Sequence, residues 1–332
     1  MLARDPEDYD RLNLDDREVE KGPLGAIFPH DLGVLSDTQL PAELPWTPFI
    51  DKWTLELALT ILKEEQLGQD DVPDMLCVSF SAMDYVHHRY GPDSLESEDT
   101  LYRVDALIAR LLNELDGLVG LEHTLIAVSS DHGFGRAPEQ VRAEGLSAER
   151  ITRDQLEAQL ADLSDQLSRS AGSSITARFM SPFIYLRHEN GQPVNPSLRE
   201  KAVRIAGTWS WTAWVATADL LRTGGVPRDA LFERATTSFR ADRGGDVLVI
   251  VRPWYIVETA ETAWSATHGS PYNYDTRVPV LFAGAGLSPA QITRPITPLD
   301  IPATLAACLN ITPPPACSGT PLPEIVGGIT GR

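Results

Sequence analysis

A short apolar run, a long amphipathic helix and a second apolar run follow one another in the first half of this chain, and this succession limits its fold most. The two runs cover residues 74–81, which include Met75-Leu-Cys-Val-Ser-Phe80, and residues 124–130. Short apolar runs of this kind are typical of buried strands. Between them, apolar side chains recur at helical spacing over residues 97–119, which predicts a helix of roughly 20 residues. The pattern predicts a right-handed βαβ unit within a mostly parallel sheet.

The same criteria predict further helices and strands along the chain. We expect helices at residues 53–66, 147–167 and 301–309, and strands at residues 183–186, 246–251 and 277–283. Residues 1–50 are expected to be mostly irregular, and the proline-rich tail mostly extended. Residues 136–264 have a less regular pattern, and we interpret them as an α+β elaboration inserted into a single α/β domain.

The charge of the chain excludes some partners. With 28 Lys and Arg against 47 Asp and Glu, the formal net charge is −19. Such a surface repels nucleic-acid polymers, and an anionic substrate would need a local positive charge, for which a bound metal is the obvious source. No apolar run is long enough to span a membrane, and the polar, acidic N-terminal residues are not expected to be a signal peptide. The sequence leaves open whether Cys308 and Cys317 pair.

The first metal motif is Asp131-His132-Gly133, which follows the second predicted strand. In open α/β sheets, ligands bind where strands end, and Gly133 allows a sharp turn there. A carboxylate beside an imidazole suits a divalent metal of borderline hardness, zinc above all. Taken alone, the pair also fits a hydrogen-bonded turn.

Two further stretches offer the same chemistry. Asp84 and His88 follow the first predicted strand, and if the chain is helical there, positions i and i+4 share one face. His87 lies near that face, but His88 is the preferred ligand; a surface loop is the alternative. His268 stands before Gly269 in a proline-containing loop, where the backbone can approach a site closely.

The five candidate ligands exceed the number that one tetrahedral zinc takes, so together they indicate a two-metal site. Two metal ions about 3.5–4 Å apart suit in-line displacement at phosphorus, because they hold both the attacking and the leaving oxygen. The candidates are Asp84, His88, Asp131, His132 and His268.

In their order along the chain, these motifs resemble the alkaline phosphatase superfamily, in the branch that groups bacterial alkaline phosphatases with type I phosphodiesterases and nucleotide pyrophosphatases. The segments concerned are Ser81-Ala-Met-Asp84-Tyr-Val-His-His88-Arg-Tyr-Gly-Pro92, Ser130-Asp131-His132-Gly133 and Thr267-His268-Gly269-Ser-Pro-Tyr-Asn-Tyr-Asp275. The resemblance extends from about Phe28 to Ile325. It implies an alkaline-phosphatase-like α/β domain over residues 1–332, with a mostly parallel sheet and helices on both faces, and with residues 136–264 as the insertion.

The resemblance also implies a mechanism and a set of ligands. Two Zn²⁺ ions flank a Thr or Ser nucleophile that is transiently phosphorylated. Asp84, His88 and His268 would hold one zinc. Asp131 and His132 would hold the other, together with an Asp and the nucleophile from the N-terminal part of the fold.

The sequence departs from this pattern at its start. Nothing before Asp84 resembles the opening strand or the nucleophile loop, so no residue is assigned as the catalytic nucleophile, and His87 replaces the usual Gly. We therefore expect an N-terminally truncated, incomplete domain that alone is inactive or very weak. The intact enzyme would be a periplasmic or secreted hydrolase of small-molecule phosphate esters. A non-catalytic metal- or phosphate-binding remnant, and a phosphomutase or sulfatase relative, remain alternatives.

Overall fold

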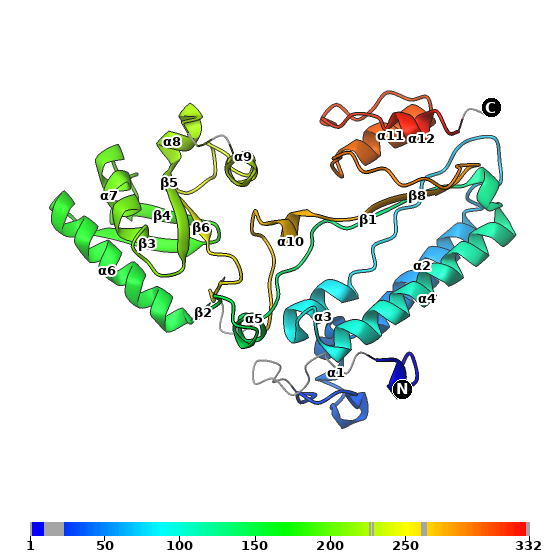
Figure 1. Ribbon diagram of the computed structural model, residues 1–332, viewed down its shortest axis with the longest axis horizontal. Helices are drawn as coiled ribbons and strands as arrows, with labels where there is room; N and C mark the ends of the chain where they lie inside the picture. The colour runs from blue at the N-terminus through cyan, green and yellow to red at the C-terminus, as the bar shows by residue number, and fades with distance from the viewer. Residues whose placement is uncertain (1, 10–22, 226, 228, 260–263, 330–332) are drawn as a thin grey trace. The chain divides into compact units, whose positions relative to one another are not determined.

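The computed structural model describes residues 2–9, 23–225, 227, 229–259 and 264–329, and the chain forms two compact units (Figure 1). Unit 1 comprises Met1–Val86, Asp93–Gly133 and Arg277–Arg332. Unit 2 comprises His87–Pro92 and Phe134–Thr276. The single domain with an insertion at residues 136–264 stays a prediction.

Two helices form the main apolar contact of unit 1. Helix α2 (Phe49–Glu64) and helix α4 (Leu95–Leu118) confirm the helices expected at residues 53–66 and 97–119. Their apolar faces meet in one cluster, because leucines recur at helical spacing on each. Members of the cluster are Leu55, Leu59, Leu62, Leu107, Leu111 and Leu115. Helix α4 begins earlier than expected, since the Ser94 side chain accepts a hydrogen bond from the Ser97 backbone N–H at 3.1 Å.

Strand β1 (Leu125–Ser129) of unit 1 has another partner than the one expected, and it pairs with that partner antiparallel. The partner is strand β8 (Val280–Gly284), so Leu125 faces Gly284. Both strands were expected, at residues 124–130 and 277–283. The predicted parallel partner of β1 was wrong, because residues 74–81 have no strand assignment and Met75 is 67% exposed. An apolar run indicates burial, but a strand also requires a neighbour with which to form a hydrogen-bond ladder.

Unit 2 contains a four-stranded sheet in the order β3-β4-β6-β5, in which all neighbours are antiparallel. Its strands are β3 (Ile175–Met180), β4 (Phe183–His188), β5 (Thr212–Thr217) and β6 (Val247–Val251). Strands β4 and β6 confirm the expectations at residues 183–186 and 246–251. The described strands are therefore mostly antiparallel, whereas a mostly parallel sheet was expected; the apolar pattern carries no information on the direction of the partner.

Helices cover both faces of this sheet. Helix α6 (Arg153–Ala171) and helix α7 (Pro196–Ala206) pack on the face that contains Val247 and Val249. Helix α8 (Ala218–Thr223) and helix α9 (Ala230–Thr237) pack on the face of Leu248 and Ile250. Burial on both sides explains why β6 is an uninterrupted apolar run. The helix expected at residues 147–167 is α6, which begins only at Arg153 after a Thr152 cap.

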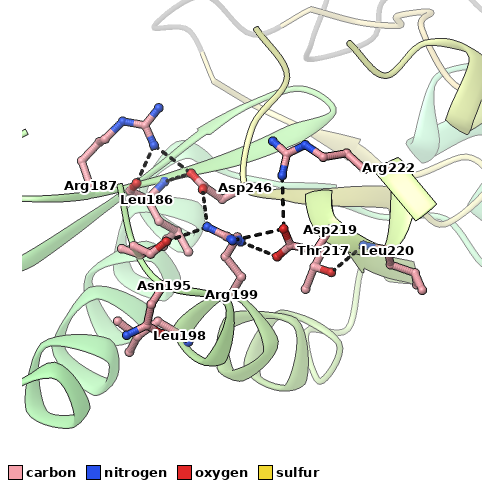
Figure 2. A network of polar contacts seen from close by, with 11 residues as sticks. Leu186, Arg187, Asn195, Leu198, Arg199, Thr217, Asp219, Leu220, Arg222 and Asp246 are labelled. Carbon is pink, nitrogen blue, oxygen red and sulfur yellow. Dashed lines mark hydrogen bonds and ion pairs between the residues drawn. The ribbon is translucent and has the colours of Figure 1, made fainter. Parts of the chain in front are cut away.

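A charged network fastens α7 to this sheet (Figure 2). The Arg199 guanidinium donates from Nε to Asp219 Oδ2 at 2.8 Å and lies 3.7 Å from Asp246 Oδ1. It also donates to the Val194 carbonyl oxygen at 2.6 Å. Asp246 also accepts from the Leu186 backbone N–H at 2.8 Å, so the two mostly buried charges, Arg199 and Asp246, lie beside each other and have further hydrogen-bond partners.

The remaining elements are short. Strand β2 (Arg150–Ile151) pairs parallel with strand β7 (Ile256–Val257). The other helices are α1 (Leu40–Glu43), α3 (Ala82–Tyr90), α5 (Pro138–Ala143), α10 (Asn273–Thr276), α11 (Asp300–Cys308) and α12 (Pro323–Val326), with 3₁₀ turns at Pro6–Asp8, Leu32–Val34, Leu44–Trp46 and Leu121–His123. Helix α11 confirms the expectation at residues 301–309. Within the described ranges, no helix combines the length and apolar character that crossing a bilayer requires, and no disulfide links Cys308 to Cys317.

Candidate metal centre

Helix α3 carries two of the five predicted ligands, Asp84 and His88, one turn apart. The helical conformation on which their shared face depended is therefore confirmed. A buried carboxylate that sequence reasoning missed supports the start of this helix: Asp51 Oδ1 accepts from the backbone N–H groups of Ser81 at 2.9 Å and Ala82 at 3.2 Å. Asp51 lies four residues before Leu55, on the apolar face of α2, and an acid in that position was the available signal.

Unit 1 brings Asp84, Asp131 and His132 together. The His132 Nε2 atom lies 3.6 Å from Asp84 Oδ1 and 3.5 Å from Asp131 Oδ2. On the other side of the ring, His132 Nδ1 lies 2.9 Å from the Gly133 carbonyl oxygen. Because a carbonyl oxygen only accepts, this bond places the ring proton on Nδ1 and leaves the Nε2 lone pair facing the carboxylates. Each carboxylate thus has one oxygen within 4 Å of the same imidazole nitrogen, and both residue types are ligands that divalent metals accept.

The turn after β1 holds this group in place. Ser130 Oγ donates to the His132 carbonyl oxygen at 2.7 Å, and Ser129 Oγ donates to the Pro279 carbonyl oxygen at 3.1 Å. Asp131 Oδ1 accepts from the His132 backbone N–H at 3.1 Å, so the hydrogen-bonded turn considered from sequence is present. The Asp131 side chain is nevertheless 86% exposed, and its other oxygen stays accessible to an ion.

Unit 2 brings His88 and His268 together, with ring centroids 5.1 Å apart. The His88 Nδ1 atom lies 3.1 Å from the Ala266 carbonyl oxygen. Because that oxygen only accepts, the ring proton is on Nδ1, and the lone pair of Nε2 is available to a metal. The ring centroid of Phe134 lies 4.8 Å from that of His88 and 5.3 Å from that of His268. The ring centroid of Trp264 lies 4.7 Å from that of His88. The two rings therefore lie among aromatic side chains that restrict their rotation.

The loop that carries His268 is shaped by two glycines and one acid. Gly269 has φ of 103°, a left-handed conformation that favours glycine. Gly135 N–H donates to the Thr267 carbonyl oxygen at 3.1 Å, and a Cβ at Gly135 would lie 2.9 Å from that oxygen. Buried Asp275 accepts from the Ser270 backbone N–H at 2.7 Å and so closes the loop. The role of Gly135 was missed, because the sequence does not show which segment its backbone approaches.

The structure therefore contains a candidate metal site, and its donors fit zinc. Asp84 and His132 belong to a group of side chains able to hold a metal ion. Within unit 2, His88 packs with His268, and the two residues are a further candidate ligand pair. Carboxylate oxygens and imidazole nitrogens are ligands that zinc accepts, and carbonyl partners on Nδ1 are the usual outer support of zinc-bound histidines.

Comparisons with curated proteins identify bacterial phosphatases among the relatives. The chain is 27% identical over 284 residues to "Alkaline phosphatase PafA" of Elizabethkingia meningoseptica, covering 85% of this chain and 51% of that protein. It is 31% identical over 279 residues to "Alkaline phosphatase PhoD" of Zymomonas mobilis subsp. mobilis, covering 80% of this chain and 47% of that protein. The chain spans about half the length of the curated relatives it matches.

Solved structures agree on the fold. The crystal structure of wild type alkaline phosphatase PafA matches with a TM-score of 0.83 at 24% sequence identity, covering 95% of this chain and 60% of that chain. This similarity confirms the α/β fold class. The family described as type I phosphodiesterase / nucleotide pyrophosphatase matches residues 18–271, which is most of the chain, and the expected resemblance is thereby confirmed. The chain belongs to the type I phosphodiesterase / nucleotide pyrophosphatase family.

Proposed function

We propose that this chain provides metal and substrate-phosphate binding for a metal-dependent phosphoric ester hydrolase of the alkaline phosphatase or phosphodiesterase type. The observation that carries the proposal is the position of His132 Nε2, 3.6 Å from Asp84 and 3.5 Å from Asp131. Membership of the family supports the reaction class. The substrates would be small-molecule phosphate esters, and the whole enzyme would act in the periplasm or outside the cell.

In this proposal, two zinc ions are held by the five candidate residues. Asp84, His88 and His268 would hold one ion, and Asp131 and His132 the other. The support comes from the chain's own hydrogen bonds, since the carbonyl groups of Ala266 and Gly133 hold the protons of His88 and His132 on Nδ1. When bound, zinc supplies positive charge and Lewis acidity toward phosphoryl oxygens.

The residues of the chain have separate tasks in the proposed reaction. Imidazole and carboxylate groups fix the positions of the ions, and the Ser129 and Ser130 hydroxyl groups hold the turn that presents His132. No Ser or Thr of the chain matches the nucleophile motif of the resemblance. The proposal therefore assigns the covalent step to none of these residues, and it expects little or no turnover from the chain alone.

Zinc binding by the purified chain tests the proposal. Competition with a chromogenic chelator should show zinc bound by the wild-type chain, and His132→Ala should weaken the binding of the ion assigned to Asp131 and His132. His123→Ala is the matched control, because the His123 side chain is 72% exposed and lies beside Glu122 at the surface. A wild-type chain without measurable zinc affinity, or equal affinities for the two variants, contradicts the proposal.

A further inference from the structure

We propose that Arg150 is a positioning residue of the candidate metal centre: it holds the backbone of Trp264 and Ser265, and through this segment it sets the orientation and tautomer of His88. The inference rests on the proposed function, because it assigns the effect to a zinc ligand of that proposal. Arg150 lies in strand β2, and all of the residues that carry the argument belong to unit 2.

Arg150 donates hydrogen bonds to two consecutive backbone carbonyl groups. Its Nη1 donates to the Trp264 carbonyl oxygen at 2.5 Å, and its Nη2 donates to the Ser265 carbonyl oxygen at 2.9 Å. The Arg150 side chain is only 11% exposed, and Ser265 is fully buried. A buried carbonyl that loses its donor bears the full penalty of its desolvation, so these two bonds restrict the path of the segment.

Two carboxylates hold the guanidinium in turn. Glu139 of helix α5 accepts from Nε at 2.8 Å and from Nη2 at 2.9 Å, and Glu258 accepts from Nη1 at 3.4 Å. These bonds and the two carbonyl bonds use all five N–H groups of the guanidinium. A planar group with five partners has one orientation, and a lysine ammonium cannot reproduce it.

The same segment contacts His88 on its other side. The Ser265 backbone N–H donates to the His88 carbonyl oxygen at 2.8 Å. The next residue, Ala266, accepts from His88 Nδ1 at 3.1 Å. The Ser265 carbonyl oxygen thus accepts from Arg150, while the Ser265 N–H donates to the His88 carbonyl oxygen. If the carbonyl end is released, the Ala266 carbonyl loses its fixed direction, and with it the bond that keeps the His88 proton on Nδ1.

A second arginine of unit 2 provides a matched control. Arg199 is 12% exposed, is held by two carboxylates, and donates to the Val194 carbonyl oxygen (Figure 2). Its partners are Asp219 on α8, Val194 just before α7 and Asp246 just before β6, and neither His88 nor residues 264–266 are among them. Loss of either arginine disturbs a buried charged network, whereas only Arg150 is connected to the ligand.

The experiment compares Arg150→Lys with Arg199→Lys in the full chain. Zinc affinity is measured by chelator competition, and the His88 tautomer by long-range ¹H–¹⁵N correlation spectra of the metal-free protein. Thermal unfolding checks that the variants fold. We expect Arg150→Lys to weaken zinc binding by about 10–100-fold, the range for outer-sphere partners of metal ligands. We also expect His88 to change from one Nδ1–H tautomer to a mixture, while Arg199→Lys leaves both measurements at the wild-type value.

Each outcome decides the inference. A folded Arg150→Lys variant with wild-type zinc affinity and an unchanged His88 tautomer overturns it, and so do equal effects in the Arg199→Lys control. If Arg150→Lys does not fold, Glu139→Gln takes its place, since it loosens the guanidinium without removing it, and the same shift in His88 is required. If the wild-type chain binds no zinc, the proposed function fails, but the tautomer comparison still decides the role of Arg150.

Discussion

The His88 Nδ1 atom and the Ala266 carbonyl oxygen lie 3.1 Å apart, although 178 positions separate the two residues. This bond selects one of the two ring nitrogens as the metal donor, because the other carries the proton. His132 has the same arrangement with its neighbour Gly133, at 2.9 Å. In both cases a backbone carbonyl oxygen accepts from Nδ1, which leaves Nε2 available to a metal.

The assignment of His88 as a metal ligand can be tested by comparison with the adjacent His87. His88→Ala should lower zinc affinity by more than about 100-fold, because loss of a ligand exceeds the 10–100-fold effect of outer partners. His87→Ala removes a ring that packs 5.1 Å from Phe134 and should leave the affinity close to the wild-type value. Chelator competition measures both. The assignment of His88 is wrong if His87→Ala has the larger effect.

The cap on helix α3 should be visible in stability. Asp51→Ala leaves the Ser81 and Ala82 N–H groups without their carboxylate acceptor. We expect a loss of about 1–2 kcal/mol in the free energy of unfolding, as for other caps. Urea denaturation measures it, with Asp37→Ala at an exposed position as the control. Equal unfolding midpoints for the two variants would show that the cap contributes nothing.

Glu139 should make the free energy of unfolding depend on pH in the acid range. Burial by itself would raise the pKa of Glu139, but the hydrogen bonds and charge of Arg150 hold this pKa below its ordinary value of 4.5. A carboxyl group with a lowered folded-state pKa contributes stability that is present above the unfolded-state value and is lost as pH falls through the folded-state value. The wild-type free energy of unfolding should therefore fall more steeply than that of Glu139→Gln below pH 4.5. Parallel curves in urea titrations across this range would contradict the prediction.

Two glycines should respond in opposite directions to the same change. Gly135→Ala places a Cβ 2.9 Å from the Thr267 carbonyl oxygen, so the backbone before His268 must move, and both stability and zinc affinity should fall. Gly117 lies in helix α4, and a Cβ added there meets no neighbouring side chain or segment within 4 Å. Gly117→Ala should therefore stabilise the chain by about 0.5–1 kcal/mol. Thermal unfolding and chelator competition measure the pair. An unchanged zinc affinity in Gly135→Ala would show that the loop tolerates the shift.

The activity of the chain is the last prediction. With added zinc, the chain alone should hydrolyse an aryl phosphate and a bis-aryl phosphate very slowly or not at all, because none of its residues matches the nucleophile motif. Positioning of a nucleophile can contribute roughly 7–11 kcal/mol to lowering a barrier. Rapid turnover that His132→Ala abolishes would show that a nucleophile lies within residues 1–332.

Local patterns were sufficient for much of the fold. The apolar faces of α2 and α4 and the uninterrupted run of β6 could be predicted, because burial leaves a periodic signature in the sequence. Strand β3 was missed, since it has only six residues, of which Ile175 and Phe179 are buried, and its apolar Met180 is exposed. The direction of pairing between β1 and β8 depends on a partner more than 150 positions away, and residue periodicity carries no information about it.

In the candidate site too, residues that are close in sequence could be predicted, and contacts between residues far apart in sequence could not. Asp131 and His132 are neighbours in sequence, and Asp84 and His88 are one helical turn apart, so these pairs could be identified from spacing. Arg150 could not, because its carbonyl partners lie more than 110 positions away and carbonyl groups are present at every residue. Supporting contacts of this kind become visible only in three dimensions.

The two-sided burial of β6 has an evolutionary consequence. Val247 and Val249 belong to one apolar cluster, whereas Leu248 and Ile250 belong to another. A change in volume at Val249 can be compensated among residues of α6 and α7, and a change at Leu248 among residues of α8 and α9, with little coupling between the two clusters. Across homologues, alternate positions of this strand should therefore co-vary with different helices. Within these five consecutive residues, substitutions on one face should be independent of substitutions on the other.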